Sequence, residues 1–230
     1  MKKIFAFATL LLLFCSNVYA ATSETITEDS IRTAQNKIDK IGFRLLNYNG
    51  IEKRTVFDFD AGRQKNASSR SRDRQITLYR GLYNRLNSDD EIAAVLAHEI
   101  SHSVDSYNGI FRGAFSSWSY TFSPKKYEYK ADKKAVDYLV NAGYNPIALI
   151  VVMNKTFPQS RYDWYSTHPL TSRRMMKIYE YIYKKYPEYL ANNEYKDDIY
   201  YQNFLLTSKG NRAKFQKKIE SNSKRSVKYL

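Results

Sequence analysis

Apolar and polar positions early in the chain follow a helical rhythm. Between residues 27 and 47, apolar side chains recur at spacings of seven, three and four positions, which brings them near one face of a helix. A threonine at the first position is a candidate N-terminal cap. The apolar face consists of Ile31, Ile38, Ile41 and Leu45. This pattern predicts an amphipathic helix.

After this helix, the apolar pattern changes to a period of two residues. The segments RTVFDFD and RQITLY, residues 54–60 and 74–79, alternate apolar and polar side chains and predict two short strands. The residues between them, 61–73, are polar and basic, which predicts a mobile loop. If the second strand forms the edge of a sheet, an extended peptide can add to it through main-chain hydrogen bonds.

The clearest helical pattern covers residues 87–106. Ser88, with Glu91 three positions later, forms a capping box at its start. An apolar stripe follows on one face of the helix. The stripe consists of Ile92, Val95, Leu96 and Ile100.

Three further helices are predicted downstream. One begins with Ser123 as its cap and Pro124 in its first turn and stops at Gly143. The next covers residues 145–157 and is apolar enough for the core, and the last covers residues 171–186. Two stripes of this last helix are predicted to pack on the domain, Met175, Ile178 and Ile182 in one and Tyr179, Tyr183 and Tyr186 in the other. The fold class is therefore α+β and mainly α-helical.

The first twenty residues differ in kind from the rest. A short basic start, an apolar run from Ile4 to Phe14, and small residues before position 21 predict a cleaved signal peptide that ends at Ala20. The apolar run is too short to span a bilayer. Lipidation at Cys15 is disfavoured because Phe14 stands where a small residue is needed, and an uncleaved anchor is the other alternative.

Charge and cysteine content narrow the chemistry. Cys15 is the only cysteine, so the predicted mature chain has no disulfide, thiol nucleophile or cysteine-ligated metal. Loss of Lys2 and Lys3 with the signal peptide lowers the formal charge from +14 to +12. A basic exported protein meets anionic lipids, acidic cell-wall polymers or nucleic acid, or it uses the charge only for solubility. The basic tail, residues 208–230, predicts partial disorder or a loosely docked helix.

The stretch LAHEISH contains two of the three histidines of the chain. His98 and His102 stand four positions apart, about 40° around a helix, so both can reach one ion. Glu99 is rotated by about 100° from His98, where its carboxylate can take a proton from a metal-bound water. The spacing H-E-x-x-H is typical of zinc hydrolases, and so few histidines make a chance match on a buried helix the weaker reading.

A catalytic zinc needs a third protein ligand. Asp105 and Asn108 stand where the extended histidine motif requires glycine and histidine, so that form is excluded. The segment YEYKAD offers Glu128 and Asp132, four positions apart on one face of the next helix. We expect Glu128 to be the ligand and Asp132 to hold the outer nitrogen of a ligand histidine, against the alternative of a solvated acidic face.

Three blocks of the chain together resemble a known family. LNSDDEIAAVLAHEISH, SPKKYEYKADKKAVDYLVNAGYNP and STHPLTSRRM occur in the order found in the zinc metallopeptidases that include the CAAX prenyl protease and the heat-shock protease HtpX. The resemblance runs from about residue 76 to residue 186. It implies a zincin-like domain with a small sheet beside the active-site helix and one zinc ion per chain, held by His98, His102 and Glu128.

The resemblance also implies roles for further residues. Glu99 is the catalytic carboxylate and Asp132 supports the site. The His-Pro block places His168 and Arg173 near the active site, His168 approaching the metal or stabilising the oxyanion and Arg173 holding a carboxylate or the substrate backbone. Many relatives have transmembrane helices, whereas the longest apolar run after residue 20 here is IALIVVM.

The chain is therefore expected to be a periplasmic or secreted zinc endopeptidase that degrades misfolded or unassembled envelope proteins. Its predicted parts are the signal peptide 1–20, a metallopeptidase domain 21–190 and a basic C-terminal extension 191–230. Expected partners are unfolded proteins and also an anionic membrane surface or the outer-membrane assembly machinery, with no specific nucleic acid. The alternatives are a non-catalytic, chaperone-like protein with the zinc fold and a basic protein that binds envelope polymers.

Overall fold

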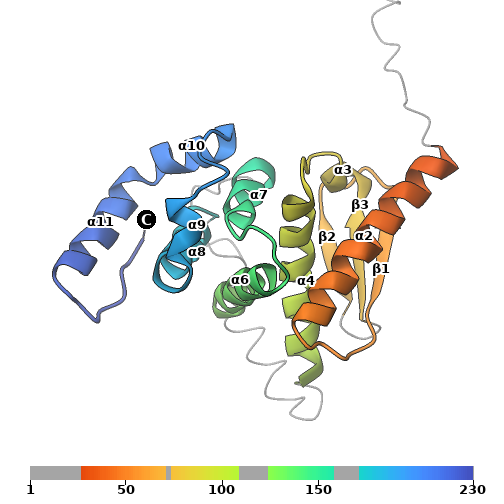
Figure 1. The fold of residues 1–230 in the computed structure, drawn as a ribbon, viewed down its shortest axis with the longest axis horizontal. Helices are drawn as coiled ribbons and strands as arrows, with labels where there is room; N and C mark the ends of the chain where they lie inside the picture. Colours follow the sequence, from red (N-terminus) through yellow and green to blue (C-terminus); the bar gives the residue numbers. More distant parts are fainter. Residues whose placement is uncertain (1–26, 71–73, 109–123, 158–170, 230) are drawn as a thin grey trace, which may run out of the picture.

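The computed structural model describes residues 27–70, 74–108, 124–157 and 171–229 of the chain. Helices predominate in this part of the chain, and a small sheet lies at one end of the molecule (Figure 1). The helices that follow the sheet in sequence extend away from it, and α10 and α11 lie at the opposite end (Figure 1). This arrangement agrees with the predicted α+β class. The predicted signal peptide, residues 1–20, lies outside the described residues.

The sheet consists of β1 (Val56–Asp60), β2 (Ala67–Arg70) and β3 (Gln75–Tyr79) in the order β1-β3-β2. β1 runs parallel to β3, and β2 runs antiparallel to it. Both strands predicted from alternation are present, but two expectations were wrong. The segment 61–73 is more than a loop because it contains β2, and β3 is the central strand, so its main chain is not a free edge.

Helix α2 (Glu28–Tyr48) covers β1 and matches the predicted amphipathic helix. Thr27 caps it by accepting a hydrogen bond from the backbone N–H of Ser30. The side chain of Gln35 donates to the carbonyl of Phe57 at 3.0 Å and accepts from the N–H of Phe59 at 2.7 Å. One amide side chain therefore satisfies two main-chain groups on the edge of β1 that faces away from β3.

After the short helix α3 (Arg80–Tyr83), helix α4 (Asp89–Asn108) packs against β2, β3 and α2. The predicted cap is present, because Ser88 Oγ accepts from the N–H of Glu91 at 3.2 Å. The Glu91 carboxylate accepts from the N–H of Asn87 and from Lys155 Nζ, the latter at 2.7 Å. Glu91 and Lys155 are both almost fully buried, so this ion pair ties the start of α4 to α7.

Helices α6 (Pro124–Asn141) and α7 (Ala148–Thr156) pack on α4. The end of α6 matches its prediction, because Gly143 has φ +73° and Tyr144 N–H donates to the carbonyl of Leu139. The first six residues of α7 are all buried, as its apolar sequence predicted. These two helices hold α4 from the side opposite the sheet.

Helix α8 (Thr171–Lys185) packs on α6 and α7, and the short α9 (Pro187–Ala191) follows it. Met175, Ile178 and Ile182 are buried as predicted. Two tyrosines of the second stripe contact the C-terminal helices, since the Tyr179 ring lies tilted against Phe204 and the Tyr183 ring meets Phe215 edge to face.

Of the two alternatives predicted for residues 208–230, the structure agrees with a docked basic helix and not with partial disorder. Helices α10 (Ile199–Thr207) and α11 (Lys209–Glu220) bury Phe204 and Phe215 against the rest of the molecule, and Tyr229 is 5% exposed. The charge of the tail favoured disorder, but these aromatic side chains supply the buried apolar area that a docked segment needs.

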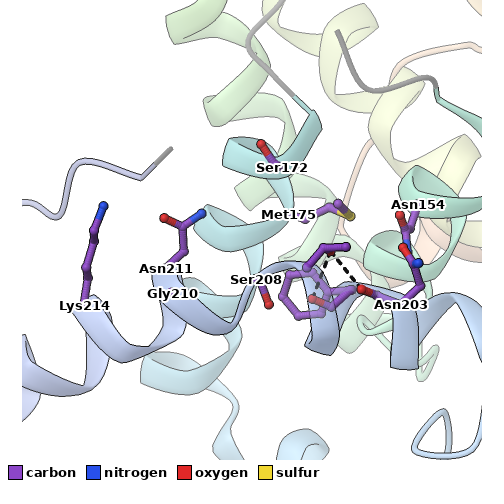
Figure 2. Close-up of a pocket in the computed structure, with 10 residues that line it drawn as sticks. Asn154, Ser172, Met175, Asn203, Ser208, Gly210, Asn211 and Lys214 are labelled. Carbon is purple, nitrogen blue, oxygen red and sulfur yellow. Dashed lines mark hydrogen bonds between the residues drawn. The ribbon is translucent and has the colours of Figure 1, made fainter. Parts of the chain in front are cut away.

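A cavity of 440 Å³ lies where α7, α8, α10 and α11 meet (Figure 2). Its apolar wall comes from Met175 and Phe204, and Asn154 and Asn203 face each other at one side, 3.0 Å apart between Nδ2 and Oδ1. None of the residues that line it belongs to the H-E-x-x-H helix. Within the part of the chain that the structure describes, no helix has the length and apolar character needed to cross a membrane.

Candidate metal centre

Helix α4 presents His98 and His102 on one face, one turn apart. Their Nε2 atoms lie 3.1 Å apart, and the rings meet edge to face. Both side chains are 14% exposed. The residues before them in α4 are buried apolar core, so the backbone that carries the two rings is held in place by packing on both sides.

Helix α6 brings Glu128 to these two nitrogens. Glu128 Oε1 lies 3.3 Å from His102 Nε2, and Oε2 lies 3.7 Å from His98 Nε2. The three side chains each offer one ligand atom within 4.8 Å of the others and could hold a metal ion. The structure thus brings together the three residues that the sequence singled out as ligands.

The donor set fits zinc. Two imidazoles and a carboxylate are ligands that zinc takes in proteins, and bond lengths of about 2.0–2.1 Å at tetrahedral angles separate neighbouring ligand atoms by about 3.3 Å. The two Nε2 atoms lie 3.1 Å apart, and the Glu128 oxygens lie 3.3 Å (Oε1) from that of His102 and 3.7 Å (Oε2) from that of His98. With a metal bound, both Nε2 atoms and a Glu128 oxygen would direct their lone pairs at the ion.

Asp132 lies one turn after Glu128 on α6 and is 1% exposed. Its Oδ1 atom lies 3.2 Å from His98 Nδ1, the nitrogen on the side of the ring away from the ligand cluster. A carboxylate at this place favours the tautomer in which Nδ1 carries the proton and Nε2 keeps its lone pair. Asp132 therefore lies beside His98, and the supporting role predicted for it stays a prediction.

Arg174 of α8 joins both carboxylates, although the sequence pointed to its neighbour Arg173, which is half-buried. The Nη1 atom of Arg174 lies 2.8 Å from Glu128 Oε2, and its Nε and Nη2 atoms donate to the two oxygens of Asp132 at 2.9 and 2.6 Å. A signal for Arg174 was present, because it stands four and eight positions before Ile178 and Ile182 and so continues their buried face.

Electrostatics favours the ionised carboxylates. Burial raises the pKa of Glu128, but the hydrogen bond with His102 and the Arg174 charge outweigh it and lower the pKa to about 2. Burial likewise raises the pKa of Asp132, and Arg174 more than reverses this. Burial lowers the pKa of His102, while Glu128 raises it to a net value above the ordinary one. The cluster is therefore negative enough to attract a cation.

Glu99 stands beside the ligand cluster on α4 and is half-buried. It is close enough for its negative charge to raise the pKa of His102 and of Arg174. One residue along a helix is a rotation of about 100°, so Glu99 and His98 point in different directions. His168 lies outside the described residues, and the roles predicted for it and for Arg173 stay predictions.

Comparison with known proteins gives one family. The model of Peptidase family M48 matches residues 32–113 and 110–182 of the chain. These ranges include most of α2, the sheet, the H-E-x-x-H helix, α6, α7 and most of α8. No curated protein matches the chain significantly. The match therefore covers all the residues that meet at the candidate metal centre.

Proposed function

Because this chain belongs to peptidase family M48, we propose that it is a zinc-dependent endopeptidase of the bacterial cell envelope that degrades misfolded or unassembled proteins. Within the family we infer a member similar to the CAAX prenyl protease and the heat-shock protease HtpX, small and exported. The convergence of His98, His102 and Glu128 on one point carries the proposal. An intact Glu99 beside them favours catalysis over binding alone, since a binding protein has no use for a base there.

In the proposed mechanism, zinc at this site would lower the pKa of a bound water toward about 7 and polarise the scissile carbonyl. The Glu99 carboxylate accepts a proton from the attacking water and later gives it to the leaving amine. His168 is proposed as a hydrogen-bond donor to the oxygen of the scissile carbonyl. Arg173 is proposed to hold the substrate backbone or a carboxylate.

Asp132 and Arg174 are proposed to keep the ligands in place. Asp132 holds the imidazole of His98 from behind, while Arg174 neutralises Glu128 and Asp132 together. Without Arg174, two buried carboxylates would repel each other and the ligand oxygen would move. This chain of contacts connects α8 with the ligand helix α4 through α6.

The sequence suggested β3 as the strand that pairs with an extended substrate, and the structure rules this out. β3 is paired on both sides, whereas β2 is an edge strand of the described sheet and packs against α4. We propose that an extended substrate adds to β2, beside the helix with the metal ligands. Only an unfolded segment can do so, which favours misfolded proteins over native ones.

The test uses the chain from Ala21 onward and measures bound zinc together with cleavage of one protein in its unfolded and its native state. About one zinc per chain and preferential cleavage of the unfolded form are expected for the wild type. Glu99→Gln should keep its zinc and lose turnover by about 100- to 10,000-fold. Glu188→Gln, the same change at an exposed glutamate, is the matched control and should change nothing.

Other results decide between the alternatives. If zinc binds but neither the wild type nor Glu99→Gln cleaves the unfolded protein, the result would favour the non-catalytic, chaperone-like protein with the zinc fold. Turnover that survives in Glu99→Gln would contradict the mechanism, and a wild type without zinc would contradict the metal site itself.

A further inference from the structure

Helices α10 and α11 bury one face and leave the opposite face to solvent. Ser208 joins them without a break in the hydrogen bonding, because its N–H donates to Phe204 and its carbonyl accepts from Arg212. The buried positions recur every three or four residues across this junction. They are Tyr201, Phe204, Ser208, Asn211 and Phe215. The two helices therefore form one rod with a buried and an exposed face, at the end of the molecule opposite the sheet (Figure 1).

The opposite side of the rod is both apolar and basic. We call it the outer face, and its exposed residues are Ile199, Gln202, Leu206, Lys209, Gly210, Ala213, Lys214, Lys217 and Glu220, of which Gly210 and Lys214 also border the cavity. Ile199 and Leu206 are each 74% exposed, the highest values among the exposed large apolar residues that the structure describes. Positions 199, 206, 213 and 217 follow one line along the rod, and Lys209 and Lys214 lie on either side of this line in α11. The large exposed aliphatic residues thus belong to α10 and the lysines to α11.

Positive charge continues beyond α11. Lys224, Arg225 and Lys228 are exposed, and Glu220 is the only acidic residue from 208 to 230. This segment is held in place, because Tyr229 Oη donates to Glu180 at 2.7 Å and the Val227 carbonyl accepts from Lys177. The acidic residues Glu194 and Asp197 precede α10, so the positive charge is concentrated at the α11 end.

We propose that the outer face binds anionic lipid bilayers in their interfacial region. A helix that binds a membrane interface combines exposed apolar side chains with basic ones, and the outer face offers both, the apolar ones in α10 and the basic ones in α11. Each lysine near an anionic bilayer adds attraction, and the aliphatic side chains enter the boundary between headgroups and acyl chains. A surface for single-stranded nucleic acid would instead combine basic residues with aromatic side chains for stacking. The exposed large apolar side chains of the outer face, Ile199 and Leu206, are aliphatic and not aromatic.

This inference does not depend on the protease proposal, because no residue of the outer face belongs to the metal centre. The test is co-sedimentation of the chain from Ala21 onward with vesicles of phosphatidylcholine alone or mixed with phosphatidylglycerol. The apolar first twenty residues are omitted because they would bind any bilayer. Binding is expected only to the vesicles with phosphatidylglycerol and should weaken as salt increases.

Two variants separate the parts of the face. K209Q/K214Q/K217Q should lower the partition coefficient by roughly 100-fold. I199S/L206S should lower it by about tenfold without a change in charge. K40Q/R63Q/K65Q removes the same charge from exposed positions outside the rod and should cost far less. Circular dichroism checks that each variant is folded.

Some results would overturn the proposal. Equal binding to neutral vesicles would remove the role of charge. Equal losses in the outer-face and control lysine variants would mean that total charge alone matters. Binding to single-stranded DNA that I199S/L206S leaves intact, together with unchanged vesicle binding in that variant, would assign the face to soluble polyanions.

Discussion

The two ends of helix α8 carry opposite kinds of charged cluster. Near its start, Arg174 is one cation between two carboxylates, Glu128 and Asp132. Near its end, Glu180 is one carboxylate among Lys177, Lys184 and Lys218. Both central residues are less than a tenth exposed, so burial alone does not separate a functional site from a structural one.

The two clusters differ in how completely their polar atoms are paired with groups of opposite charge. The Glu180 oxygens accept from lysine ammonium groups and from the Tyr229 hydroxyl, and cations are in excess there. At the first cluster, two imidazole nitrogens and a carboxylate converge at 3.1 to 3.7 Å, and the carboxylates exceed the arginine. An excess of converging acceptors marks a cation site, whereas an excess of donors around one acid marks a structural ion cluster.

The largest effect should come from the ligand carboxylate. Glu128→Gln removes a charged zinc ligand, and we expect zinc affinity and turnover to fall by more than about 100-fold. Glu180→Gln is the matched change at the other cluster and should leave both unchanged. Zinc titration and cleavage of an unfolded protein provide the measurements. Equal zinc affinity in the two variants would show that the clusters do not differ as described.

The next effect concerns Arg174. Arg174→Ala leaves two buried carboxylates without their cation, which should destabilise the zinc-free protein by about 3–5 kcal/mol. Denaturation by urea in a chelator measures this, with Arg173→Ala as the comparison. Since Arg173 is less buried than Arg174, its loss should cost less. The reverse order would mean that Arg173 supports the site.

A smaller effect is expected behind the ligands. Asp132→Asn keeps the shape of the side chain but removes the charge that faces His98 Nδ1. We expect zinc affinity to fall by about 10- to 100-fold, the usual loss for an outer partner of a ligand histidine. The variant should show this loss under conditions in which it is fully folded. An unchanged zinc affinity would remove Asp132 from the metal site.

The smallest effect is the pH dependence of the Glu180 cluster. Burial raises the pKa of Glu180, but its hydrogen bonds with Lys184, Tyr229 and Lys218 outweigh it and lower the pKa to about 2. A depressed pKa stabilises the folded state above the ordinary value near 4.5, and this is lost as pH falls toward 2. The partners are partly exposed, so we expect about 1–2 kcal/mol between wild type and Glu180→Gln at pH 7. A gap that stays constant from pH 7 to pH 3 would contradict this.

The local elements follow from the sequence because their causes are local. Helical periodicity predicted α2, α4, α6, α7 and α8, and Thr27, Ser88 and Gly143 mark ends that the structure confirms. Strand β2 escaped prediction because its sequence, ASSR, has no apolar alternation. Strand β2 forms because its main chain pairs with the side of β3 that β1 leaves open, and because α4 packs against β2.

The candidate site divides in the same way. The spacing of His98, Glu99 and His102 on one helix follows from the sequence alone, since helix geometry fixes which of them share a face. Tertiary packing decided three further features. It brings Glu128 to the two histidines, and it lets Arg174 rather than Arg173 join the carboxylates. It also docks the basic tail through Phe204, Phe215 and Tyr229. These contacts join residues far apart in the chain. Their energy comes from how whole helices fit together, and short-range patterns do not contain that information.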